Sequence, residues 1–269
     1  MGTFDLITAT ASLTGVAAFG GLVATAPDTL TVRNLGGETP GRLVGFGRKG
    51  ATAGSVRLRS PYLHDPTNGI RGRVLAADPT SVLDYDGYQL LRPQDTLILE
   101  STGGAAAEQE SGWMLNYYPR LVGRDGRYIT SKELAARRVE LVTNEVAVTT
   151  GAAGVWGSAA LSAGTGEIKA DADYAVIGWV TDVACTAVGI SAPETGNFRT
   201  GGPGVTTKNF TRSFFEDMGD NMGVPAVPVF NGSNLASVVV WAVDNTAALV
   251  VNVDLVLAHV LHHADENWS

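Results

Sequence analysis

The sequence has few of the residues from which disulfides, metal sites and phosphate-binding surfaces are built. It contains one cysteine, Cys185, and four histidines, and charged residues make up only 17% of its 269 positions. A single cysteine excludes an intrachain disulfide framework and a zinc site made of cysteines. We therefore expect Cys185 to be a small buried residue. Acidic residues outnumber basic ones by 27 to 19, and this balance disfavours nonspecific binding to nucleic acid.

Long uninterrupted hydrophobic runs are also missing. The N-terminal stretch, residues 1–26, is apolar in part, but it lacks a basic segment, carries Asp5 and is interrupted by Thr, Ser and Gly. From this pattern we expect neither a secretory signal nor a membrane span.

No arrangement of residues indicates a catalytic or metal site. His64 stands alone, whereas His259, His262 and His263 follow the last apolar segment beside Asp265 and Glu266. In a strand His262 points away from the other two, so one metal-binding face is not enforced. We interpret the cluster as a solvated chain end, with a weak metal site as the alternative. The motif-like stretches "ALSAG", "RTGGPG" and "DYDG" lack the residues that their motifs require and are typical of turns. We expect no enzymatic activity, no cofactor and no metal.

What the sequence does contain is many short apolar segments between turns. Glycine occurs 33 times, and the segments "TLTVR" (29–33), "SVRLR" (55–59), "TLILE" (96–100) and "WMLNYY" (113–118) alternate or run apolar. Short strands bounded by Gly, Pro, Asn and Asp are typical of an all-β sandwich or barrel.

One pattern of segments occurs twice. The stretch Val44-Gly45-Phe46 matches Ile177-Gly178-Trp179, and Val56, Leu58 and Pro61 match Val188, Ile190 and Pro193 after one residue of slippage. Upstream, "TGVAAFGG" (14–21) parallels "TGAAGVWGS" (150–158). Each copy spans roughly 120 residues, far longer than the units of propellers and solenoids. The sequence therefore predicts two tandem jelly-roll-like β-sandwiches related by internal duplication, at residues 1–125 and 139–269, joined by a linker at 126–138.

Two helices interrupt the strand pattern. "TSKELAARR" in the linker predicts a short helix capped by Ser131. In the second copy, Phe210, Phe214, Met218 and Met222 recur every four residues, which predicts an inserted amphipathic helix near 207–222 whose Phe and Met side chains face the core. The matching place in the first copy, residues 64–89, reads as a long polar loop.

Tryptophan offers a further interpretation. Trp113, Trp156, Trp179 and Trp241 could stack on sugar rings, as in a carbohydrate-binding or adhesin module. Because all four lie in apolar strand contexts, core packing is the better account. Trp268, near the polar C-terminus, is expected to be exposed.

Two fused sandwiches with one inserted helix resemble the double jelly-roll capsid proteins of bacterial and archaeal viruses. The resemblance covers nearly the whole chain but rests on copy number, copy length and strand pattern, without a diagnostic motif. It implies a virion protein, made in the host cytoplasm and most simply that of a bacteriophage, that assembles with itself as a trimer or larger symmetric assembly and with other virion proteins. A decoration or spike protein, the carbohydrate-binding module and a bicupin enzyme remain alternatives.

The loops after Pro61 and Pro193 are the expected contacts between copies. Long excursions in a compact β domain are commonly functional. The residues predicted at this oligomer interface are His64, Asp65, Asn68, Arg71, Arg73, Glu194, Asn197 and Arg199.

Overall fold

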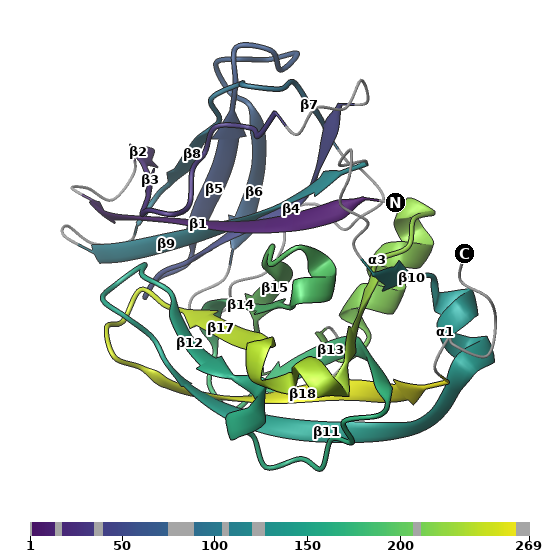
Figure 1. Cartoon of the computed structure of the whole chain (residues 1–269). Helices are drawn as coiled ribbons and strands as arrows, with labels where there is room; N and C mark the ends of the chain where they lie inside the picture. Colours follow the sequence, from purple (N-terminus) through teal and green to yellow (C-terminus); the bar gives the residue numbers. More distant parts are fainter. Residues whose placement is uncertain are drawn as a thin grey trace.

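The structure is a computed structural model that describes residues 2–13, 18–34, 40–74, 89–103, 108–119, 127–206 and 211–261. Most of its regular structure is strand, so the predicted all-β sandwich fold is confirmed. Four antiparallel sheets form two sandwiches, one from each half of the chain (Figure 1). We call them the first and the second sandwich.

The first sandwich contains sheets I and II. Sheet I has the strand order β3-β1-β9-β4-β7, and sheet II has the order β2-β8-β5-β6. The strands are β1 (Thr3–Leu13), β2 (Gly20–Gly21), β3 (Val23–Ala24), β4 (Gly41–Lys49), β5 (Gly54–Arg59), β6 (Ile70–Val74), β7 (Gln89–Leu91), β8 (Ile98–Ser101) and β9 (Glu108–Tyr118).

The second sandwich contains sheets III and IV. Sheet III has the strand order β12-β17-β14-β15, and sheet IV has the order β10-β16-β13-β18-β11. The strands are β10 (Tyr128–Ile129), β11 (Arg138–Thr149), β12 (Gly157–Ala160), β13 (Asp173–Thr181), β14 (Cys185–Ser191), β15 (Thr200–Gly204), β16 (Val227–Asn231), β17 (Val239–Val243) and β18 (Val250–Val260).

Both sandwiches are wound in the same way. If β3 and β10 are set aside, each has eight strands, in which the first pairs with the last, the second with the seventh, the third with the sixth and the fourth with the fifth. This is the winding of a jelly roll. The first sandwich pairs β1·β9, β2·β8, β4·β7 and β5·β6, and the second pairs β11·β18, β12·β17, β13·β16 and β14·β15.

The agreement extends to a single irregularity. The pairing of β4 with β9 skips Val44, and the pairing of β13 with β18 skips Ile177, each directly before a glycine. Phe46 and Trp179 then stand at matching positions after this bulge, opposite Met114 and Leu255. Both aromatic side chains are buried. A common ancestor of the two halves remains a proposal, which this agreement supports.

The four sheets stack in the order II, I, III, IV, so sheets I and III are inner layers (Figure 1). The alternating side chains of β1 and β9 therefore enter two cores: Ile7 and Met114 belong to the core of the first sandwich, and Leu6 and Trp113 to a larger core that continues into the second. Because both faces are covered, residues 110–118 of β9 and all of β14 are buried without the usual alternation of buried and exposed positions. The predicted domain limits 1–125, 126–138 and 139–269 remain a prediction, since one core crosses them.

The linker helix α1 (Ser131–Arg137) lies where it was predicted, but its cap is Thr130 and not Ser131. The Thr130 side chain accepts a hydrogen bond from the Glu133 amide at 3.1 Å, and the Glu133 carboxylate accepts one from the Thr130 amide at 2.7 Å. This reciprocal capping box fixes the helix start one residue earlier.

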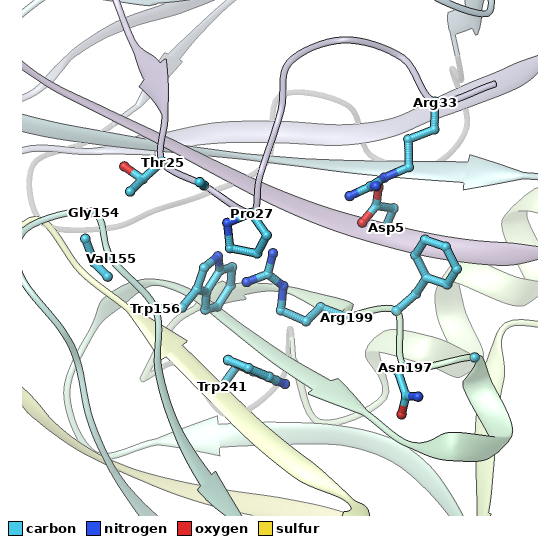
Figure 2. A pocket seen from close by; sticks show the side chains of 13 residues that line it. Asp5, Thr25, Pro27, Arg33, Gly154, Val155, Trp156, Asn197, Arg199 and Trp241 are labelled. Atoms are coloured by element: carbon cyan, nitrogen blue, oxygen red, sulfur yellow. The ribbon is translucent and has the colours of Figure 1, made fainter. Parts of the chain in front are cut away.

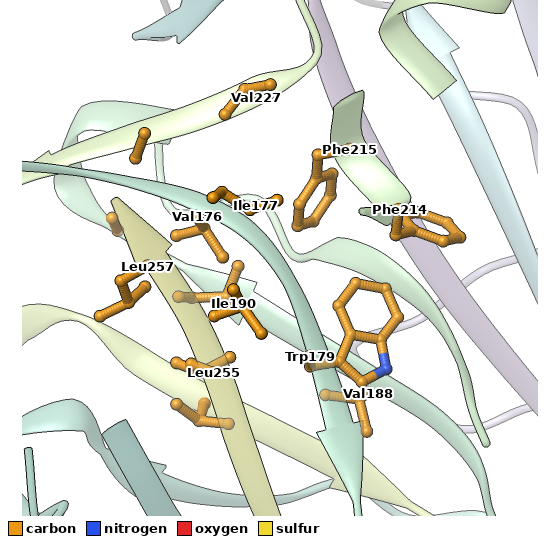
Figure 3. Close-up of a cluster of buried hydrophobic side chains, with 14 of the residues drawn as sticks. Val176, Ile177, Trp179, Val188, Ile190, Phe214, Phe215, Val227, Leu255 and Leu257 are labelled. Atoms are coloured by element: carbon orange, nitrogen blue, oxygen red, sulfur yellow. The ribbon is translucent and has the colours of Figure 1, made fainter. Parts of the chain in front are cut away.

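The inserted helix is shorter than its pattern suggested. Helix α3 runs Phe214–Met222, and Phe210 lies outside the described residues. Its buried side chains are Phe214, Phe215, Met218 and Met222, which confirms the core-facing prediction. Trp179 of β13 contacts the Phe214 ring at 4.7 Å and the Phe215 ring at 5.6 Å between centroids (Figure 3). The helix packs beside β13 and β16 and covers the side of the second sandwich core at this point.

Two local predictions were wrong. The segment 29–33 forms one isolated bridge, Thr31 with Thr96, because its amides and carbonyls pair irregularly with residues 94–97. Part of the region 64–89 read as a loop is strand β6, whose Ile70 and Val74 pair with β5. Residues 75–88 lie outside the described part.

Candidate functional site

A hollow of about 400 Å³ opens at one margin of the junction between the two sandwiches (Figure 2). Both halves of the chain build it. Its lining consists of Asp5, Thr25, Ala26, Pro27 and Arg33 from the first sandwich and Gly154, Val155, Trp156, Gly196, Asn197, Phe198, Arg199 and Trp241 from the second. The volume falls within the range of small-molecule binding pockets, about 300–1,000 Å³.

Two residues that line the hollow, Trp156 and Arg199, are held by Asp28, which is only 7% exposed. Its carboxylate accepts hydrogen bonds from the Thr8 amide of β1 at 2.9 Å and from the indole nitrogen of Trp156 at 2.8 Å. It also forms an ion pair with Arg199. A buried carboxylate requires such partners, so Asp28 joins the edge of β1 to two residues of the second sandwich.

Arg199 lies between two indole rings. Its guanidinium carbon is 4.5 Å from the centre of the Trp156 ring and 5.4 Å from that of Trp241 (Figure 2). Guanidinium groups stack on aromatic faces in this way. Burial lowers the pKa of Arg199 to about 10, so the group remains charged at neutral pH. The Trp241 indole nitrogen in turn donates to Ser191 Oγ at 2.8 Å.

A second arginine lies at the other end of the hollow. Arg33 donates from Nε to the buried Asp5 carboxylate at 2.5 Å, and its guanidinium lies 5.8 Å from the centre of the Phe198 ring. Asn197 is exposed at the rim with a left-handed φ of 61°, a conformation that asparagine tolerates better than most residues. The hollow therefore combines aromatic walls with two arginines, each paired with an aspartate.

The predicted interface residues fall into two groups. His64, Asp65, Asn68, Arg71 and Arg73 are exposed on the first sandwich, the two arginines on β6. Asp65 closes a turn by accepting from the Asn68 amide and its side chain, both at 2.8 Å, and these bonds lower the pKa of Asp65. For these five residues a role between copies remains a prediction.

The other three residues make contacts within the chain. Glu194 lies just before the hollow-lining residues 196–199 in the sequence. It accepts hydrogen bonds from the Asn231 amide at 3.0 Å and the Asn234 side chain at 2.7 Å. Asn197 and Arg199 line the hollow itself. The loops after Pro61 and Pro193 thus occupy the same place in their jelly rolls but differ in surroundings, since the second is packed at the junction.

Sequence reasoning placed two of four tryptophans correctly. Trp113 and Trp179 are buried in the core. Trp156 and Trp241 are half-buried and line the hollow, which corrects their assignment to the core. Trp241 lies in the run "VVVWAV", where Val240 and Ala242 face the sandwich core. Both faces of this strand are apolar, so the sequence pattern could not show whether Trp241 faces the sandwich core or the junction.

Histidine contributes little to this region. His259 Nδ1 is 3.5 Å from a Glu140 carboxylate oxygen, and His64 is exposed far along the chain from it. His262 and His263 lie outside the described residues. Among the residues that the structure covers, no group of three His, Cys, Asp or Glu side chains is placed to hold a metal ion.

Cys185 is buried, as expected, and burial raises the pKa of its thiol. None of the helices in the described segments has the length and apolarity to cross a membrane.

No family model matches the chain, and no curated protein matches its sequence. Among solved structures it is similar to the major capsid protein P2 of bacteriophage PM2, with 8% identity, 98% of this chain and 99% of that chain covered, and a TM-score of 0.23. It is also similar to the PBSX exported protein XepA, with 12% identity, coverage of 95% and 86%, and a TM-score of 0.27. TM-scores this low do not establish a shared fold.

Proposed function

We propose that the chain is a structural protein of a virus particle, most simply a bacteriophage capsid or capsid-associated protein, which assembles head to tail with copies of itself. The observation that carries this proposal is the way in which the two jelly rolls meet inside one chain. Jelly rolls serve in viral capsids, lectins and cupins alike, so the fold alone does not decide between these functions.

The internal junction joins two non-equivalent faces. The outer face of sheet I in the first sandwich packs on the outer face of sheet III in the second. Sheet IV of the second sandwich corresponds to sheet I, and sheet II of the first corresponds to sheet III. These two corresponding sheets form the outer layers of the molecule. A contact between unlike faces can be repeated from chain to chain, and it closes into a ring when the rotation allows.

The two outer faces carry charged residues of mainly opposite sign, although Arg138 at the start of β11 is also exposed. On sheet II the outward positions, which alternate with buried Val56 and Leu58, hold Arg57, Arg59, Arg71 and Arg73 against the single acidic residue Glu100. On sheet IV the exposed residues Glu145 and Asp254 face outward, with Asp182 directly after β13. Complementary potentials favour association of such faces and fix its orientation. Arg71 and Arg73, predicted at an oligomer interface, lie on the positive face.

The experiment is a charge swap followed by sedimentation velocity and negative-stain microscopy. The variant Arg71→Glu/Arg73→Glu and the variant Glu145→Lys/Asp254→Lys should each shift the protein toward monomer. The chain that carries all four substitutions should regain the trimer or larger assembly, because its faces are again complementary. Lys132→Glu on α1 changes the charge by the same sign on another surface and should leave assembly unchanged.

Two results would count against the proposal. One is wild-type protein that stays monomeric at high concentration and forms no closed particles. The other is an assembly that the charge swaps leave intact, which would place the contact between copies elsewhere.

A further inference from the structure

The junction hollow has unused binding capacity. Arg199 stacks on Trp156 and Trp241 and pairs with Asp28, which also accepts from the Trp156 indole nitrogen. A space of about 400 Å³ nevertheless remains beside these side chains. Within the described residues Arg33 uses Nε for Asp5, so its two terminal nitrogens remain for a ligand. The Asn197 amide stands exposed at the rim. A contact that only joined the two sandwiches would need no such space.

The charges around the hollow cancel. Arg33 is paired with Asp5 and Arg199 with Asp28. A phosphate or sulfate group would find no net positive charge here, and a cation would find no free acidic cluster. A neutral ligand with many hydroxyl groups avoids both penalties, because guanidinium and amide N–H groups donate to hydroxyl oxygens and carboxylates accept from hydroxyl hydrogens.

The walls favour a ring with an apolar face. Trp156 and Trp241 both lie against Arg199 (Figure 2). The Phe198 ring also lines the hollow, 5.8 Å from the Arg33 guanidinium. Pro27 adds a further apolar surface. Predominantly aromatic walls with a few placed polar groups are the usual composition of a pocket for a small organic ligand. A pyranose presents C–H groups on one face and hydroxyls around its edge, which matches this distribution.

We infer that the hollow between the two jelly rolls binds a neutral pyranose sugar, the terminal residue of a glycan. The sugar ring enters between Pro27 and Phe198, and its hydroxyl groups bond with Arg33, Asn197 and Asp5. This inference does not depend on self-assembly, since one chain supplies every residue of the site.

The probes are methyl glycosides of glucose, galactose and mannose, with methyl glucuronide as a carboxylated comparison. Binding is measured by saturation-transfer NMR and titration calorimetry. A monosaccharide is small, so we expect a Kd on the order of 1 mM for the preferred neutral sugar. The glucuronide should bind no more tightly than the parent glucoside, because the site has no net positive charge.

Two variants test the location. Thr25→Trp adds a large side chain at the hollow and removes no hydrogen bond of the site, and Phe198→Ala removes one aromatic wall. Each should weaken binding at least tenfold while the melting temperature shows that the protein is folded. The matched control is Tyr62→Ala, which removes an aromatic ring outside the hollow, 4.4 Å from the Arg92 guanidinium. It should bind sugar as the wild type does.

The inference is overturned if no neutral glycoside binds at 20-fold the expected Kd, roughly 20 mM. It is equally overturned if Thr25→Trp binds as tightly as the wild type, or if the glucuronide alone binds. Self-assembly is read separately by sedimentation, so a failure of either proposal leaves the other one testable.

Discussion

The two sandwiches share one winding, but corresponding sheets carry different residues on their outer faces. In sheet II, Arg57 and Arg59 pair with Glu100 at 2.6 and 2.7 Å on an outer layer of the molecule. The registers place Gly189, Ser191 and Trp241 at the corresponding positions of sheet III. This face of sheet III packs on sheet I, and Gly189 leaves room for the Leu6 side chain of β1. Charged residues stand where the layer is outermost, and small or aromatic residues stand where it is covered.

The interiors differ as well. The first sandwich buries an ion pair between Arg48 of β4 and Glu110 of β9, with two contacts of 2.6 Å and no exposure of either side chain. At the corresponding positions the second sandwich has Thr181 and Val251. A jelly roll of this winding therefore does not need a buried ion pair at these positions.

The largest expected effect comes from exchanging the residues at one matched position. Gly189→Arg places a guanidinium in the junction, where a Cβ would already be 3.3 Å from Leu6. An uncompensated buried charge costs about 3–5 kcal/mol, and we expect the free energy of unfolding to fall by about 5 kcal/mol, measured by urea denaturation.

The control substitutions separate the causes. Gly189→Ala should cost far less, because Gly189 has ordinary backbone angles and its neighbour is a flexible Leu6 side chain. Arg57→Gly, the reverse exchange on the outer face, leaves Glu100 paired with Arg59 and should cost about 2 kcal/mol, as for loss of one hydrogen bond to a charged group. Equal losses for Gly189→Arg and Arg57→Gly would contradict the layer order.

The next effect concerns the element that the first sandwich lacks in its described part. Phe214→Ala removes a fully buried ring that contacts Trp179 and lies against Gly202 of β15. Truncating a buried Phe costs about 3–5 kcal/mol, and we expect about 4 kcal/mol by urea denaturation. Tyr62→Ala, on an exposed ring, should change stability by less than about 0.5 kcal/mol. A loss for Phe214→Ala as small as that would mean that α3 does not stabilise the core.

A third prediction removes the buried charges of the first sandwich, so that its interior resembles the uncharged interior of the second at these positions. Arg48→Met alone leaves the Glu110 carboxylate buried without its partner and should cost about 3 kcal/mol. The double variant Arg48→Met/Glu110→Leu removes both charges and should lie within about 1 kcal/mol of the wild type, since apolar replacements of buried ion pairs are often neutral. A double variant that is no more stable than Arg48→Met alone would show that the pair itself stabilises the first sandwich.

Most of the strands could be predicted because they depend on local pattern. The glycine and aromatic after Val44 and Ile177 recur because the same bulge has to be formed at the same place. Burial of Phe214 and Met218 followed from their spacing. The junction could not be predicted in this way, because Arg199 and Asp28 are 171 residues apart and neither lies in a motif. The order of the layers depends on which outer face is covered, and both kinds of face occur in each half.

The smallest expected effect is a pH dependence specific to the first sandwich. Burial raises the pKa of Glu110 from 4.5 to about 7, although hydrogen bonds from Arg48 and Ser101 act in the opposite direction. A carboxyl whose pKa is raised on folding adds stability that is fully present below its unfolded value and is lost as the pH rises through the folded value. The wild type should therefore lose stability, roughly 2 to 3 kcal/mol, between about pH 4.5 and pH 7. Glu216 of α3 has a raised pKa for the same reason and contributes a slope of the same sign.

Glu110→Gln should make the slope of stability against pH shallower than in the wild type, as measured by urea denaturation at several pH values. Glu216→Gln serves as the matched variant in the second sandwich. An unchanged slope in Glu110→Gln would mean that Arg48 holds Glu110 ionised throughout this range, and the two interiors would then differ in packing but not in titration.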